Sequence, residues 1–332
     1  MQKYRLAIDA IGNDLGYQPL VEALETFKEA NPNFIFTIVA DVEKIKPLFK
    51  NFDNLNFINN PEKATLENVS LRQAQKQSSS MKTAFELLKD KKVDAILSAG
   101  DTAILLAHST FVLERLTGVD RPAFMPVFPT INQGQKFLML DVGANLEVKP
   151  SYIYQWAKLA FIFSKNVLGV KIPRLNILNI GTEDYKGFAW HREASQLIEA
   201  DKTLAPFYKG FLEPRELMNG VTDIIIADGY AGNMVLKSYE GAVKSFGQLI
   251  KREITASFMK KMGALILKGA FKNAKNVLDH RNVGGAYVIG VDGLVVKAHG
   301  NSDKTAFLGA LGQIKNALEK NIIMQFKNAI RE

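Results

Sequence analysis

Five apolar runs of the sequence end in small groups of glycine, carboxylate and amide residues. In an open α/β sheet, ligands bind beyond the carboxyl ends of the strands, where glycine lets backbone N–H groups approach an anion. Glycine, asparagine and aspartate also make ordinary turns, so one group alone is more typical of a turn. Five together predict a shared polar cleft. The groups are Asp9–Asp14 (DAIGND), Ser98–Thr102 (SAGDT), Asp141–Asn145 (DVGAN), Asn179–Asp184 (NIGTED) and Asp228–Asn233 (DGYAGN).

The most concentrated polar segment is KAHGNSD, which begins at Lys297 and follows the apolar run LVV. His299 is suited to accept a proton and Lys297 to neutralise an anionic oxygen. The alternative is a capped turn with a surface lysine, in which Ser302 or Asp303 begins the next helix. The three hydroxyls of SSSM (78–81) likewise suit either a phosphate or a helix cap.

Composition and the absence of certain motifs exclude several other kinds of site. The chain has no cysteine, which excludes disulfides, zinc–cysteine sites, iron–sulfur clusters and a cysteine nucleophile. It has neither a GxGxxG after a strand nor a GxxxxGK[ST], so the standard dinucleotide fingerprint and the P-loop are absent. Its four histidines lack the spacing of metal ligands. We therefore expect neither a metal nor a cofactor.

Short β-rich runs that alternate with helical patterns must position these groups. We expect βαβ units and a mostly parallel sheet covered by helices, because the strands are apolar almost throughout. A turn at Asp292-Gly293 predicts a hairpin between two short strands. Strands are expected at 5–9, 34–40, 93–98, 137–141, 175–180, 223–227 and twice within 288–297, and helices at 17–30, 102–116 and 303–331, the last either continuous or broken.

The length of 332 residues suits about two domains or one large α/β domain. We expect one domain over residues 1–332, and a boundary near residue 140 is the alternative. The apolar stretch near the first residue is too short for a signal peptide, and no apolar run approaches the ~20 residues of a membrane span. A cytoplasmic protein is therefore expected.

Basic residues are concentrated in one segment, 243–282. It carries nine Lys and Arg residues against two acids, or +7 of a net charge of +8. Within it, 265–278 predicts an amphipathic helix with an apolar side and a lysine side, which suits an anionic membrane or an acidic protein. A helix packed on the core is the alternative. Nucleic acid is not expected, because stacking aromatics are not interleaved with the lysines. The expected contact residues are Lys268, Phe271, Lys272 and Lys275.

Nine motifs stand in one order along the chain: DAIGND, SSSM, SAGDT, DRPA, DVGAN, LNIGTEDYKG, DGYAGNMVLK, VGGA and KAHGNSD. In this order they resemble the PlsX phosphate acyltransferase family, over essentially the whole chain. The resemblance implies a Rossmann-like α/β/α fold, similar to the phosphotransacetylase and isocitrate dehydrogenase-like folds, and a homodimer. It implies transfer of a fatty acyl group from acyl-[acyl carrier protein] to inorganic phosphate, giving acyl phosphate for phospholipid synthesis. It further implies a soluble protein that associates peripherally with an anionic membrane.

The resemblance also implies roles for particular residues. Lys186 would hold phosphate or stabilise an oxyanion, Asn233 would donate to a carbonyl or phosphate oxygen, and His299 would handle a phosphate proton. Phosphate would attack the thioester directly, without an acyl-enzyme. The expected substrate- and phosphate-binding residues are Asp9, Gly12, Ser79, Ser80, Gly100, Asp101, Thr102, Asn145, Gly181, Asp228, Gly232, Lys297 and Ser302.

The chain departs from the family pattern at four positions. Asn13 and Ala103 replace glycines, Asp101 replaces an asparagine, and Phe188 stands where asparagine is common. Asp101 matters most, because a carboxylate beside phosphate repels it. Three alternative functions remain open. They are a phosphotransacetylase-type enzyme acting on acyl-coenzyme A, a metal-dependent decarboxylating dehydrogenase of related fold, and a non-catalytic scaffold for membrane or acyl carrier.

Overall fold

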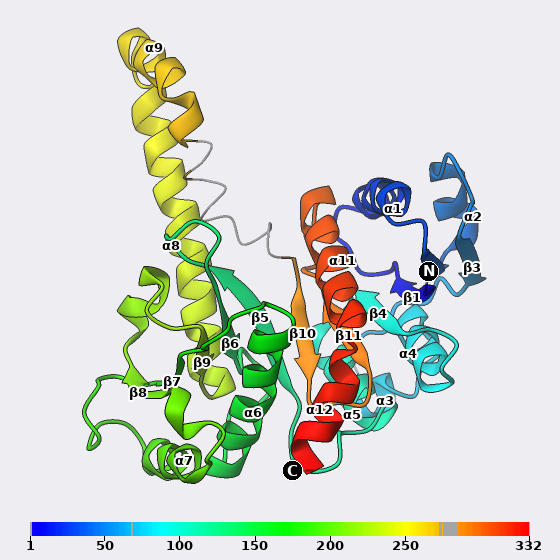
Figure 1. Cartoon of the computed structure of the whole chain (residues 1–332). Helices are drawn as coiled ribbons and strands as arrows, with labels where there is room; N and C mark the ends of the chain where they lie inside the picture. Colours follow the sequence, from blue (N-terminus) through cyan, green and yellow to red (C-terminus); the bar gives the residue numbers. More distant parts are fainter. Residues whose placement is uncertain (1, 68, 272–273, 275–283, 332) are drawn as a thin grey trace.

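The computed structural model describes residues 2–67, 69–271, 274 and 284–331, and their strands form a single sheet (Figure 1). Its eleven strands run in the order β3-β2-β1-β4-β11-β10-β5-β6-β9-β7-β8. Their bounds are β1 Tyr4–Asp9, β2 Phe34–Ala40, β3 Leu55–Asn59, β4 Ala95–Ser98, β5 Ala123–Pro129, β6 Lys136–Leu140, β7 Leu175–Leu178, β8 Tyr208–Leu212, β9 Ile224–Ile226, β10 Ala286–Ile289 and β11 Leu294–Lys297.

Helices cover both faces of this sheet. One core cluster packs α1, α6, α11 and α12 on one face, and a second packs α4, α5 and the start of α8 on the other. Successive residues of β1 belong to opposite clusters, as the two-residue period of a strand requires. The helices are α1 Gln18–Ala30, α2 Val42–Ile45, α3 Leu71–Ala74, α4 Ser80–Lys89, α5 Thr102–Phe111, α6 Pro150–Asn166, α7 Ala189–Ala200, α8 Gly229–Thr255, α9 Phe258–Ile266, α11 Lys304–Glu319 and α12 Ile322–Arg331.

The predicted α/β fold with a mostly parallel sheet is confirmed. Strands β3, β2, β1, β4 and β11 are parallel to one another, and so are β6, β9, β7 and β8. Three antiparallel pairings through β10 and β5 join these two halves. The two halves therefore point in opposite directions.

Most predicted elements are found, but three strands and the helices α6, α7 and α8 were not predicted, and one helix was predicted too long. The strand 34–40 and the hairpin at Asp292-Gly293 are confirmed. The missed strands are β5, whose sequence AFMPVFP holds two prolines, and β3 and β8 at the sheet edges. The helix predicted to reach residue 116 ends at Phe111. The closing helix breaks after Glu319, where Asn321 has φ +48°.

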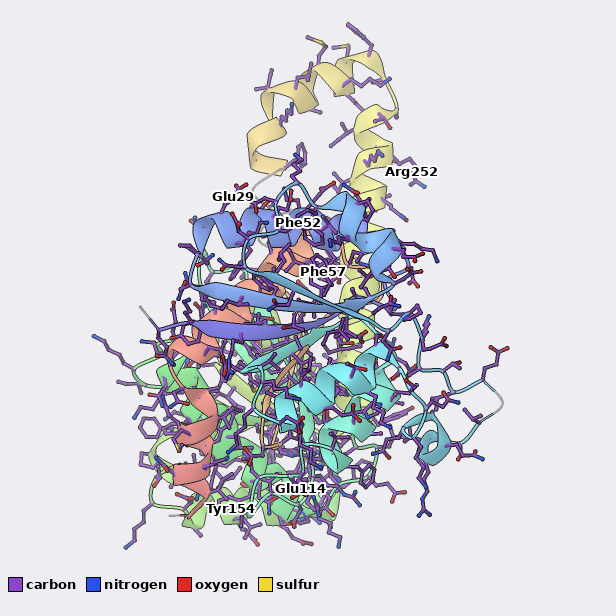
Figure 2. All side chains as sticks on the ribbon, turned by 90° about the vertical axis from the view of Figure 1, so that its right-hand side faces the viewer. Glu29, Phe52, Phe57, Glu114, Tyr154 and Arg252 are labelled. Carbon is purple, nitrogen blue, oxygen red and sulfur yellow. The ribbon has the colours of Figure 1, made fainter. Side chains whose placement is uncertain are left out.

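The helix α8 and the shorter α9 extend away from the body as a helical arm (Figure 1). Figure 2 shows Arg252 on this arm, above the body. The helix predicted for 265–278 is not continuous, because α9 begins earlier and ends at Ile266; Lys272 and Lys275 lie outside the described residues. Packing on the core is wrong for the described part of 265–278, since Leu265 is 64% and Ile266 86% exposed. No described helix is long and apolar enough to cross a membrane.

Candidate active site

A cleft of about 330 Å³ lies on one face of the sheet, between α5 and α8. Polar residues from α5, β11 and α8 line one part of it, and apolar residues from β5 and β10 line another. Three of the five groups predicted to share a cleft line it, those at 98–102, 141–145 and 228–233, and so does the segment at 297–303. The groups at 9–14 and 179–184 supply no lining residue. The polar residues that line it are Thr102, Asn233, Lys237, Glu240, Lys297 and His299.

A buried carboxylate, Asp9, anchors the strand ends beside the cleft. It accepts hydrogen bonds from the hydroxyls of Ser80 and Ser98, each at 2.6 Å. Burial raises the pKa of Asp9, and the two hydroxyl donors oppose that rise. The neighbouring Ser79 caps α4 by accepting from the N–H of Lys82, at 3.1 Å. The third hydroxyl at this helix start, that of Ser78, accepts from the amide of Asn60 at 3.5 Å, so all three are engaged within the protein.

Lys297 lies at the carboxyl end of β11, two strands away from Asp9, and lines the cleft. Burial lowers the pKa of its ammonium to about 8, while the charges of Asp101, Asp9 and Asp14 act in the opposite direction. Its ammonium donates to the carbonyl of Ala298. A cation removed from water beside an open cleft gains more from an anionic ligand than a hydrated cation does.

The carboxylate of Asp101 serves as the N-cap of α5. It accepts from the N–H groups of Ala103 and Ile104, at 2.9 and 3.0 Å. Asparagine is an equally good N-cap, so the cap alone does not require the negative charge. That charge raises the pKa of Lys297. Thr102, the first residue of the helix, lines the cleft itself.

The turns that contain Gly12 and Gly100 pack against each other, beside the segment that carries His299. Gly12 has φ +112°, and a Cβ there would lie 2.8 Å from the Cα of Gly100, so only glycine suits this position. The amide of Asn13 donates to the carbonyl of Ser302 at 2.9 Å, which gives this departure from the family pattern a structural role. Of the two candidate caps, Asp303 begins α11, accepting from the N–H of Ala306 at 3.0 Å.

His299 faces the middle of α8 across the cleft. Its Nε2 lies 3.8 Å from Oε1 of Glu240, and about half of its side chain is exposed. Glu240 and Lys237 did not figure among the predicted site residues, although both lie on the same helical face as Asn233. Lys237 lies four residues and Glu240 seven residues after Asn233, and this helical spacing is the sequence signal that places all three on one face.

The start of α8 is held against the loop that follows β6. Asp228 caps the helix by accepting from the N–H of Ala231 at 2.8 Å. A Cβ on Gly232 would lie 1.9 Å from the carbonyl oxygen of Asp141, so glycine permits this close approach. Asn145 donates to Asp141 and to the carbonyl of Pro122, at 3.0 and 2.7 Å. These residues place α8 beside the cleft but do not line it.

Asp141 is the buried centre of this loop. Its carboxylate accepts from the backbone N–H groups of Phe124, Gly143, Ala144 and Asn145. Burial raises its pKa, and these donors oppose the rise. Asp141 was not among the predicted substrate- and phosphate-binding residues, although it opens the group DVGAN after the run FLML.

The loop after β7 carries Lys186 and Gly181, two of the predicted site residues. Lys186 forms an ion pair with Glu183, with 2.9 Å between Nζ and Oε1, and both side chains are exposed. The hydrogen bond to Glu183 raises the pKa of Lys186. Gly181 packs under the Lys186 side chain. Neither residue lines the cleft. Within the described ranges, no three His, Asp or Glu residues are grouped as a metal site.

The fold is that of the phosphotransacetylase class. The phosphotransacetylase from Streptococcus pyogenes superposes with a TM-score of 0.60 and 14% identity, covering 99% of this chain and 95% of that one. The branched-chain phosphotransacylase from Enterococcus faecalis gives a TM-score of 0.59 and 12% identity, covering 94% and 98%. At these identities the likeness concerns the fold alone.

The chain belongs to the family described as fatty acid synthesis protein, whose model matches residues 4–325. Curated relatives named phosphate acyltransferase cover nearly its whole length, which confirms the family resemblance. The protein from Mycoplasma mobile is 46% identical over 325 residues, covering 98% of this chain and 99% of its own. The one from Streptococcus pneumoniae is 38% identical over 323 residues, covering 97% of each.

Proposed function

We propose that this protein is a phosphate acyltransferase that moves a fatty acyl group from acyl-[acyl carrier protein] to inorganic phosphate. The single observation that carries the proposal is the partly buried Lys297, placed in a cleft that is polar on one part and apolar on another. The polar part suits phosphate and the apolar part suits a fatty acyl group. Relatives named phosphate acyltransferase, similar over the whole length, support the same reaction.

Phosphate is held in this proposal by Lys297 and the hydroxyl of Thr102. Both residues line the cleft, and Thr102 opens α5, where the helix dipole favours a negative charge. The N–H groups of Ala103 and Ile104 are already taken by Asp101, so the side chains carry the contact. We assign the role of phosphate-binding cation to Lys297 rather than to Lys186, because Lys186 lies outside the cleft and is paired with Glu183.

The chemical step forms one carbon–oxygen bond and breaks one carbon–sulfur bond. A phosphate oxygen attacks the thioester carbonyl, and the amide of Asn233 or the ammonium of Lys237 donates to the developing oxyanion. Holding both substrates in one cleft supplies much of the rate enhancement. The thiolate then leaves, and acyl phosphate is the product.

His299 moves the proton in this scheme. It accepts the proton of hydrogen phosphate during attack and returns it to the departing sulfur, which gives the free thiol. Glu240, 3.8 Å from Nε2, orients the ring. The mechanism has no acyl-enzyme, which suits a chain without cysteine. Trapping an acyl-protein on the normal turnover path would contradict it.

The helical arm, α8 and α9, is proposed to make the contacts with other macromolecules. Its described part carries Lys251, Lys260, Lys261 and Lys268 together with exposed apolar side chains such as Phe258. Basic and apolar side chains together suit the surface of an anionic membrane, and the basic charge suits the acidic carrier protein. Exposed Phe246 and Leu249, farther from the tip, suit a second copy in a homodimer. The protein is thus proposed to be cytoplasmic and peripherally membrane-associated.

The proposal is tested by release of carrier-protein thiol from palmitoyl-[acyl carrier protein], with and without phosphate. Phosphate-dependent release, with acyl phosphate as product, is the expected result. The same assay with palmitoyl-coenzyme A separates the alternative donor, because release from coenzyme A alone would give a phosphotransacetylase-type enzyme. No release from either donor would overturn the proposed function and favour the scaffold.

A further inference from the structure

A row of side chains crosses the sheet under the cleft and changes from polar to apolar. The strand register pairs Asp9 with Ser98, Ser98 with Lys297, Lys297 with Ala286, and Ala286 with Pro126. Directly paired residues project to the same face of a sheet. The row therefore presents a carboxylate, a hydroxyl and an ammonium on one part of this face. On the other part it presents a methyl group and a proline ring.

The apolar part of the row continues into a trough. Phe124 and Phe128 lie two residues on either side of Pro126 in β5, so they project to the same face and also line the cleft. Phe128 stacks on Phe137 at 5.1 Å between ring centroids and meets Tyr239 of α8 edge-on at 6.1 Å. Val142 and Leu236 line the same cleft.

We propose that this apolar trough over β10 and β5, with Leu236 of α8 as its wall, holds the fatty acyl chain of the thioester. The inference rests on the proposed function. The carbonyl carbon then lies at the boundary between Lys297 and Ala286, and the first methylenes of the chain cross Ala286 and Pro126. Ala286, the smallest side chain of the row at this boundary, is the specificity-determining residue.

The chemistry of the trough favours the acyl chain over the carrier's prosthetic linker, the other half of the thioester. That linker contains amides, which would have to give up water against Pro126, Phe124 and Phe128 without gaining hydrogen bonds. An alkyl chain gains from the same surfaces, by a factor of about four in affinity for each buried methylene. The volume of about 330 Å³ is at the low end for ligand pockets, so an added side chain at Ala286 displaces ligand.

The experiment compares acetyl and palmitoyl donors in the variant Ala286→Leu, because an acetyl group has no methylenes to cross Ala286. The expected result is a loss of roughly tenfold or more in kcat/KM for the palmitoyl donor, and a loss at least about fourfold smaller for the acetyl donor. The matched control is Ala30→Leu, at the exposed end of α1, which should leave both values unchanged. An equal loss for both donors in a folded Ala286→Leu protein would overturn the inference.

A second variant covers the possibility that leucine in β10 prevents folding. Leu236→Ala shortens a half-buried side chain on α8 and should raise KM more for palmitoyl than for acetyl donors. Equilibrium binding of palmitate alone separates this inference from the proposed function. If the wild type releases no thiol, the proposed function fails, and weaker palmitate binding by both variants still supports the trough. Unchanged palmitate binding in both variants overturns it.

Discussion

Two lysines follow strands in the two halves of the sheet, and their surroundings differ in a way that bears on catalysis. Lys297 lines the cleft, and burial lowers the pKa of its ammonium to about 8. Lys186 is exposed and paired with Glu183, whose hydrogen bond raises its pKa. A lysine already paired and hydrated gains little from phosphate, whereas a desolvated lysine beside an open cleft gains much. Burial, more than the surrounding motif, therefore distinguishes the two lysines and is our reason for proposing Lys297 as the cation that binds phosphate.

The largest expected effect is that of Lys297→Met. Loss of this cation should lower kcat/KM for phosphate by roughly 100- to 1000-fold, the range for removal of one electrostatic group at a reacting centre. Steady-state thiol release over a range of phosphate concentrations measures it. Lys186→Met is the matched comparison and should cost less than about tenfold, in line with an exposed ion pair. A larger loss in Lys186→Met than in Lys297→Met would reverse the ranking of the two lysines.

The pH dependence of the reaction should reflect the same lysine. Lys297 is protonated below its pKa of about 8 and neutral above it, so kcat/KM for phosphate should fall as the pH rises through about 8. In Asp101→Asn the N-cap of α5 persists, but one charge that raises this pKa is removed. The falling limb should then move to lower pH. A limb that stays in place in this variant would show that Asp101 does not act on Lys297.

The shift of Lys297 also affects stability. The unfolded chain holds this proton up to a pKa near 10.5, whereas the folded protein releases it at a pKa of about 8. Between these values the unfolded state binds more protons, so this residue's contribution to the free energy of unfolding rises with pH. Denaturant titrations at pH 8 and pH 10, compared between the wild type and Lys297→Met, measure the difference. A slope with pH that is the same in both proteins would contradict the assignment.

A smaller effect is expected at the buried anchor Asp9. In Asp9→Asn, only one side-chain oxygen remains to accept from the hydroxyls of Ser80 and Ser98. The NH2 group of the asparagine then lies against the other hydroxyl and cannot accept its hydrogen bond. The free energy of unfolding should fall by about 1–3 kcal/mol at neutral pH. Denaturant unfolding measures it, with the exposed Glu29→Gln on α1 as control. Equal stability of Asp9→Asn and wild type would argue against a structural role for the carboxylate.

The smallest expected effect on turnover belongs to the helical arm. Lys261→Glu combined with Lys268→Glu should weaken binding to anionic vesicles by at least tenfold, because each basic residue near such a surface contributes about 1 kcal/mol. Turnover of a soluble donor should change little. Sedimentation with vesicles measures binding, and Lys202→Glu in the body is the control. If vesicle binding is unchanged while affinity for acyl carrier protein falls, the arm contacts the carrier protein instead.

The sequence predicted the inner strands of the two parallel halves well, because they are short apolar runs that end in turn residues, but it missed the edge strands β3 and β8. Strand β2 was found with its predicted bounds. The sequence did not predict β5, because its two prolines oppose the assignment of a strand, although β5 forms the floor of the cleft. The order of strands also lay beyond the sequence, because β10 and β5 join the halves through long-range pairing.

The sequence identified candidate polar residues, but it did not predict the contacts that each of them makes in the folded protein. The sequence gives Lys186 and Lys297 similar surroundings, each close to glycine and polar residues, and only tertiary packing separates them. Several predicted ligand residues act as caps or spacers, as Asp228 and Gly232 do at the start of α8. Such roles depend on neighbours distant in sequence, which a single motif does not reveal.

The most direct test of the account measures thiol release from palmitoyl-[acyl carrier protein] at increasing phosphate in three proteins. These are the wild type, Lys297→Met and Lys186→Met. The account predicts phosphate-dependent release by the wild type, a loss of at least about 100-fold in kcat/KM for phosphate in Lys297→Met, and near wild-type behaviour in Lys186→Met. Full activity of a folded Lys297→Met protein, or release that does not depend on phosphate in the wild type, would contradict it.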